Sequence, residues 1–134
     1  MNSKREIIGI GLLVCMASGW VLLRAQTTEN DSDPVKLMPY MFRVRLENAY
    51  MRVLEYHSEP GDKEPMHFHP PGVVCYLSEG TIRVADRQGH IEERHLKAGD
   101  VSWRNRTWHA AENVGKTQVR ALAIELKMPL EDLK

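Results

Sequence analysis

Residues 61–80 read GDKEPMHFHPPGVVCYLSEG, and the fold of the chain can be reasoned outward from this stretch. Glycine stands at both ends, and one residue separates His67 from His69. Successive side chains of a β-strand point to opposite faces of a sheet, so the two imidazoles share a face if the segment is extended. The Pro-Pro-Gly turn at 70–72 ends that segment. The stretch therefore predicts a strand that presents two metal-binding side chains together.

The chain beyond residue 40 has the patterning of β-strands. Apolar and polar residues alternate over 41–46, 50–56 and 81–86, whereas 73–77 and 119–126 are apolar enough for more fully buried strands. Turn sequences rich in Gly, Pro, Asn and Asp separate these segments. Many short strands at this spacing predict an all-β protein, an antiparallel sandwich or barrel.

The 134 residues divide into one small domain and an N-terminal extension. We expect a signal peptide or membrane anchor over 1–25, a linker and N-terminal arm over 26–40, a β-barrel domain over 41–128 and a C-terminal tail over 129–134. Lys and Arg together number 18, and so do Asp and Glu. The chain therefore has no excess of positive charge that would predict a nucleic-acid partner.

The extension has the order of an export signal. Lys4 and Arg5 precede an uncharged apolar segment at 7–23, and a polar stretch begins at Gln26. Either the chain is cleaved after Ala25, or the apolar segment stays as a membrane anchor. Both alternatives predict a domain outside the cytoplasm, periplasmic or extracellular, with membrane contact only if the segment is retained.

A third imidazole belongs with the first two. His109 follows a Gly-Asp turn and an aromatic strand and leads toward Asn113. With these residues in place, the sequence resembles the cupin superfamily, in particular its small single-domain, cupin-2-like members. Matches to the two cupin motifs occur at Gly61, His67, His69 and Gly80 in the first and at Gly99, His109 and Asn113 in the second.

The resemblance covers residues 43–127 and carries several expectations. It implies a double-stranded β-helix, the cupin jelly-roll barrel, with a metal or a small ligand in its mouth. It also implies a homodimer, which would protect exposed strand edges.

One departure from the first motif changes the expected ligand set. Val73 stands where the motif has a glutamate, so the usual three histidines and carboxylate reduce to His67, His69 and His109. Such a set suits divalent Fe, Zn, Mn, Ni or Cu and leaves coordination positions open. Cys75 shares a strand face with Val73, and its thiolate is an alternative ligand. The default for a buried free cysteine is a small hydrophobe.

Other residues are candidates for the wall of a pocket. Trp103 either faces the cavity or packs in the core, and Val73, Cys75 and Arg83 complete the pocket prediction. Arg83 lies between Ile82 and Val84 and so faces away from both, which makes surface exposure its default. Arg83, Arg104 and Arg120 are the cations able to hold an acidic substrate. Glu64 is expected on the opposite face from His67 if the strand is regular, and no catalytic residue is identified.

Three functions from different classes fit these observations. The first is an exported cupin that binds a divalent metal and performs dioxygenase- or isomerase-like chemistry on a small anionic molecule. The alternative is a non-catalytic cupin that binds or senses a small ligand, with or without metal. A scaffold that only mediates dimerisation is a third. An enzyme requires an open metal position that faces a cavity with a polar anchor, whereas a scaffold requires a filled barrel.

Overall fold

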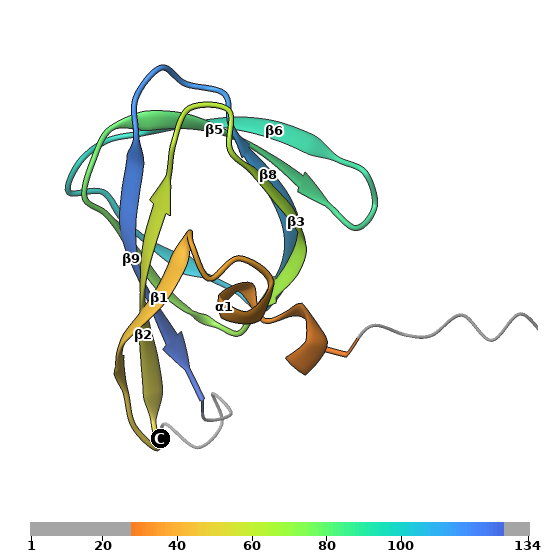
Figure 1. The fold of residues 1–134 in the computed structure, drawn as a ribbon, viewed down its shortest axis with the longest axis vertical. Helices are drawn as coiled ribbons and strands as arrows, with labels where there is room; N and C mark the ends of the chain where they lie inside the picture. The colour runs from red at the N-terminus through yellow and green to blue at the C-terminus, as the bar shows by residue number, and fades with distance from the viewer. Residues whose placement is uncertain (1–27, 128–134) are drawn as a thin grey trace, which may run out of the picture.

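Two antiparallel sheets face each other in the computed structural model, which describes residues 28–127 (Figure 1). One sheet has five strands in the order β1-β2-β9-β4-β7, and the other has four in the order β3-β8-β5-β6. The strands are β1 (Phe42–Glu47), β2 (Met51–Ser58), β3 (Lys63–His69), β4 (Gly72–Tyr76), β5 (Gly80–Asp86), β6 (Ile91–Leu96), β7 (Val101–Arg104), β8 (Thr107–Asn113) and β9 (Val119–Leu126). The predicted all-β barrel is therefore confirmed.

The two ends of the chain lie outside the described residues. The predicted signal or anchor over 1–25 and the tail over 129–134 belong to them. Between residues 28 and 127, no helix is long and apolar enough to cross a membrane.

The central strand β9 leaves space between the sheets. Its inward side chains are Val119, Ala121, Ala123 and Glu125, all of them buried, and they alternate with more exposed residues as a strand predicts. Two alanines in succession on this face fill little volume. A cavity lies in front of them, and both alanines line it.

An irregularity in β3 brings an unexpected side chain to the inner face. Glu64 pairs with Ala111 of β8, but the next pair joins His67 to His109, so β3 has one residue more than its partner over this interval. Pro65 lies in this bulge and has no backbone N–H to donate. Glu64 and His67 are therefore both buried, and the predicted opposite facing of Glu64 is wrong because the strand is not regular.

Strand β6 was not predicted. All its residues except Leu96 are exposed, and its charged sequence lacks the apolar alternation that predicted the other strands. It forms because it pairs with β5 along its whole length, from Leu96 opposite Gly80 to Ile91 opposite Ala85.

The expected linker over 26–40 is packed against the barrel in the part that the structure describes. It contains a 3₁₀-helix (Asn30–Ser32) and the short helix α1 (Pro34–Leu37). Asp33 accepts a hydrogen bond from the backbone N–H of Val35 at 2.9 Å, which caps α1. The same carboxylate forms an ion pair with Arg52 of β2 at 2.7 Å. Ser32 and Met38 are buried, so these residues do not form a free spacer.

Gly72 is required where β4 meets β9. A Cβ atom at this position would overlap the backbone carbonyl oxygen of Ile124, which a rotamer change cannot move. We predict that Gly72→Ala lowers the free energy of unfolding by about 2 kcal/mol or more, measured by thermal unfolding. Gly89→Ala is the matched control: its φ of +86° strains an alanine, but no atom lies within 4 Å of the added carbon. Its cost should be about 1 kcal/mol. An equal or smaller loss for Gly72→Ala would contradict the steric argument.

Candidate metal centre

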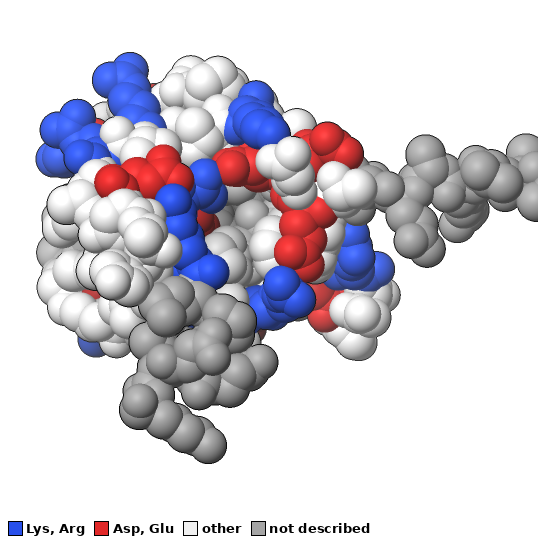
Figure 2. Space-filling model, turned by 90° about the horizontal axis from the view of Figure 1, so that it is seen from below, with Lys and Arg blue, Asp and Glu red and all other residues white. Residues whose placement is uncertain are grey.

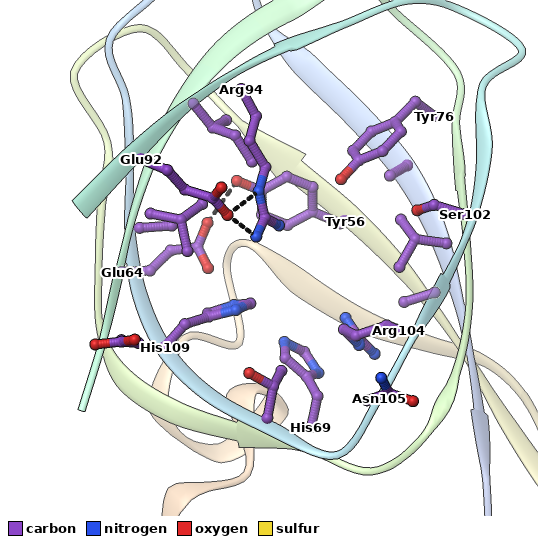
Figure 3. Close-up of a pocket in the computed structure, with 18 of the residues that line it drawn as sticks. Tyr56, Glu64, His69, Tyr76, Glu92, Arg94, Ser102, Arg104, Asn105 and His109 are labelled. Carbon is purple, nitrogen blue, oxygen red and sulfur yellow. Dashed lines mark hydrogen bonds and ion pairs between the residues drawn. The ribbon is translucent and has the colours of Figure 1, made fainter. Parts of the chain in front are cut away.

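Three histidines converge inside the barrel. His67 and His69 come from β3, and His109 comes from β8, where it pairs directly with His67. One ring nitrogen of each lies within 4.8 Å of the others, close enough for the three to bind one metal ion. His67 and His69 are almost fully buried, and His109 is partly buried. The close-up in Figure 3 shows His69 and His109 at one end of the cavity.

Hydrogen bonds determine which ring nitrogens carry protons. The Nδ1–H of His67 donates to the carbonyl oxygen of Pro65 at 2.8 Å, and the Nδ1–H of His69 donates to Oε1 of Glu125 at 2.5 Å. A carbonyl oxygen and an ionised carboxylate can accept hydrogen bonds but cannot donate them, so each Nδ1 atom must carry the proton. The Nε2 atoms of neutral His67 and His69 therefore direct lone pairs at each other across 2.9 Å.

Two lone pairs at this separation repel unless a cation lies between them. An added proton is disfavoured near neutral pH, because burial lowers the pKa of His67 to about 4 and lowers the pKa of His69 and His109 well below the usual value. A divalent metal ion requires neutral imidazoles with free lone pairs. The donor set thus fits a metal better than a proton.

Glu125 orients His69 and is itself held by two arginines. Arg52 donates to Oε2 from Nε at 2.9 Å and from Nη2 at 2.6 Å. Arg104 donates to Oε1 from Nη2 at 3.2 Å. Such carboxylate–histidine contacts orient ligand imidazoles at metal sites. The sequence analysis missed Glu125, although a lone carboxylate at an inward position of an apolar strand signals a buried ion pair.

A second buried carboxyl group lies beside the cluster. Oε2 of Glu64 is 3.4 Å from Nε2 of His67, and Oε1 accepts a hydrogen bond from the Tyr56 hydroxyl at 2.5 Å. Burial raises the pKa of Glu64 to about 7, although the bond from Tyr56 opposes this effect. The group of three histidines within 4.8 Å does not include Glu64. A carboxyl group therefore stands next to His67, although the motif glutamate is absent at Val73.

The cluster opens into a cavity of about 570 Å³, a usual size for a small-molecule site. One part of the wall is apolar, with Phe42, Val74, Ile82, Val84, Ala111, Ala121 and Ala123. The polar part includes Tyr56, Tyr76, Arg94, Ser102, Arg104 and Asn105, which surround the space in Figure 3. Seen from below, the molecule is hollowed, and charged side chains of both signs gather around the hollow (Figure 2).

The structure divides the predicted pocket residues. Trp103 lines the cavity, although half of its surface is exposed. Val73 and Cys75 are not among the lining residues, because β4 turns Val74 and Tyr76 inward instead. The sulfur of Cys75 is therefore not directed toward the histidines, and the alternative ligand set is wrong.

The three predicted cations also differ in position. Arg83 of β5 is exposed and pairs with Glu93 and Glu112, so it lies outside the cavity. Arg120 is half exposed and pairs with Glu55. Arg104 lines the cavity. Alternation explains the placement of Arg83, which stands between the inward Ile82 and Val84.

Fold and site together define a double-stranded β-helix protein with a histidine cluster inside its barrel. The family model described as a cupin domain matches residues 54–125, and the chain belongs to this family. A comparison with curated proteins gives no match.

Several solved structures share the fold. A cupin domain from Bordetella pertussis Tohama I is 23% identical with a TM-score of 0.62, and the match covers 66% of this chain and 93% of that one. A protein with a double-stranded β-helix domain from Klebsiella pneumoniae is 21% identical with a TM-score of 0.53, covering 76% and 89%. The polyketide cyclase RemF from Streptomyces resistomycificus is 18% identical with a TM-score of 0.50, covering 65% and 64%. At these identities the similarity concerns the fold alone.

The buried histidines predict acid sensitivity of the metal-free protein. An unfolded histidine takes up a proton near pH 6.5, whereas folded His67 does so near pH 4. Stability should therefore fall as the pH drops through this interval, by roughly 3 kcal/mol for His67 alone. Urea unfolding at several pH values measures the loss.

Glu64 has the opposite effect and provides the control. Its raised pKa stabilises the folded state as the pH falls from about 7 toward 4.5. Glu64→Gln removes this contribution. The free energy of unfolding of the variant should therefore decrease more steeply with falling pH than that of the wild type. Constant or rising stability of Glu64→Gln between pH 6.5 and 4 would refute the assignment of buried neutral histidines.

Proposed function

We propose that this cupin binds a divalent transition metal through His67, His69 and His109 and performs metal-dependent chemistry on a small anionic molecule. One observation carries the proposal. The Nε2 atoms of His67 and His69 lie 2.9 Å apart while both Nδ1 atoms donate to oxygen acceptors. This arrangement offers two aligned lone pairs to one cation, and His109 adds a third nitrogen.

Imidazole ligands favour Fe, Zn, Ni or Cu, and Mn, which prefers oxygen ligands, is the least favoured of the five predicted metals. When bound, such an ion would supply Lewis-acid or oxygen-binding chemistry, as in dioxygenase- and isomerase-like reactions. Three neutral imidazoles leave its charge uncompensated, which favours an anionic partner. His69 and His109 face the cavity, so an anion entering there would reach the centre.

The cavity bears on the competing functions. A space of about 570 Å³ argues against a filled barrel that acts only as a scaffold. The same space supports the non-catalytic alternative, a cupin that binds or senses a small ligand, with or without metal. A metal-free protein would favour this alternative, whereas bound metal fits both functions and turnover of a small anionic molecule would separate them.

Export and dimerisation are further parts of the proposal. Export to the periplasm or the extracellular space rests on the charge and hydropathy of residues 4–26. A homodimer is supported by the exposed apolar residues Val44 and Leu46 on β1, at the edge of the five-stranded sheet.

Metal content tests the centre. We expect about one equivalent of metal per chain in protein purified without chelator, and little in the double variant His67→Ala, His69→Ala, because only one nitrogen of the cluster remains. Elemental analysis measures both. At 100 times the dissociation constant, metal should stabilise the wild type by about 2.7 kcal/mol, which thermal unfolding detects.

The matched control is His57→Ala, His95→Ala. Both histidines are exposed and lie outside the cluster, so this variant should keep wild-type metal content. A folded wild type that stays metal-free after Fe, Zn, Mn, Ni and Cu are offered would end the metal-centre proposal.

Glu125 should set the affinity of the centre. Glu125→Gln removes the charged acceptor for His69 Nδ1–H, and we expect metal affinity to fall about 10- to 100-fold. Competition with a chelator measures the affinity, and thermal unfolding checks the fold, since Arg52 and Arg104 lose their shared partner. Glu55→Gln is the control, because Glu55 pairs with Arg45 and Arg120. If both variants bind metal equally, Glu125 has no role in orienting the ligand.

A further inference from the structure

Arg104 differs from the other arginines around the cavity because its side chain is largely buried with a single partner among the described residues, whereas the side chains of Arg94 and Arg106 are exposed. Arg94 donates to Glu92 from both Nε and Nη2, and Arg106 pairs with Glu29 at 3.2 Å. Arg104 has a single hydrogen bond within residues 28–127, the 3.2 Å contact with Glu125. Its side chain is 16% exposed, so water compensates little for the missing partners.

The acceptor of Arg104 is already shared. Oε1 of Glu125 accepts from His69 Nδ1 at 2.5 Å, and Oε2 accepts twice from Arg52. A guanidinium carries five N–H donors, and Nε of Arg104 is buried without a partner. A buried donor without a hydrogen-bond partner is energetically unfavourable. Nη1 makes no hydrogen bond within residues 28–127 and is not buried, so it can donate to an incoming carboxylate, with Nη2 as the second donor of a bidentate pair.

Arg104 is also close to the histidine cluster. Oε1 of Glu125 contacts Nη2 of Arg104 on one side and Nδ1 of His69 on the other. Figure 3 shows Arg104 beside His69 at the same end of the cavity, with Asn105 nearby. A group bound by Arg104 would therefore lie at the same end of the cavity as His69 (Figure 3).

The remaining wall indicates the body of the ligand. Val74, Ala121 and Ala123 present an apolar surface from β4 and β9, and Ile82 and Val84 do so from β5. These side chains cannot pair with polar groups. A molecule with an acidic end and an apolar body matches both parts of the wall.

We propose that Arg104 binds the carboxylate of a small organic acid with an apolar body, and that this acid is the ligand of the cavity. The inference deepens the function proposed above and rests on it for the nearby metal. It concerns Arg104 rather than Arg83 or Arg120, which pair with carboxylates outside the cavity.

Benzoate and benzamide test this inference, because they share size and shape and differ in charge. Each is titrated into the full chain, both metal-free and zinc-loaded, and the Nε–Hε signals of the arginines are followed by NMR. We expect benzoate to shift the Arg104 signal and to bind about tenfold or more tightly than benzamide.

Variants assign the effect to one side chain. Arg104→Gln should weaken benzoate binding about tenfold or more, and Arg120→Gln should leave it unchanged. If Arg104→Gln does not fold, Arg104→Lys replaces it, since it keeps the charge and loses the planar fork. This variant should bind benzoate measurably more weakly than the wild type.

Three results would overturn the inference: equal affinity for benzoate and benzamide, wild-type affinity in the folded Arg104 variant, or no benzoate binding in either metal state. Zinc content of the same samples tests the metal centre separately. Bound zinc without benzoate binding would support the metal centre and refute the role of Arg104. Arg104-dependent benzoate binding in protein that does not bind zinc would support the role of Arg104 and refute the metal centre.

Discussion

The carboxylate of Glu125 is the contact on which the interior of this barrel depends. It lies on β9 in one sheet and accepts a hydrogen bond from His69 on β3 in the other. Arg52 joins the same carboxylate to Asp33 and so to the N-terminal arm. A buried charge is tolerable only where partners surround it. One side chain therefore links both sheets, the arm and the orientation of a candidate metal ligand.

The bulge in β3 has a comparable effect on the chemistry of the site. In a regular strand, residues three apart face opposite sides. The extra residue around Pro65 places Glu64 on the inner face with His67, within hydrogen-bond reach of Tyr56. The barrel lacks the motif glutamate on β4, yet an acidic group stands beside the histidines. An irregular backbone thus introduces a carboxyl group that the motif does not describe.

The cavity and its polar wall connect the fold to the proposed function. Two alanines on β9 leave room between the sheets, while Arg104 at the end of β7 enters that room with most of its donors unused within the described residues. The histidines supply ligands for a cation, and the arginine supplies donors for an anion. These groups lie at the same end of an otherwise largely apolar space, which supports a small organic acid as the ligand.

The sequence by itself determined the barrel, because alternation, turns and motif glycines are local signals. The spacing of His67 and His69 and the position of His109 likewise identified the three side chains that the structure brings together. Only the tertiary structure decided the facing of Val74 over Val73, the burial of Glu64 and the pairing of Glu125 with His69. Each depends on register or on contacts between strands far apart in the chain: a one-residue shift reverses facing, and a buried carboxylate is defined by partners up to 73 residues away.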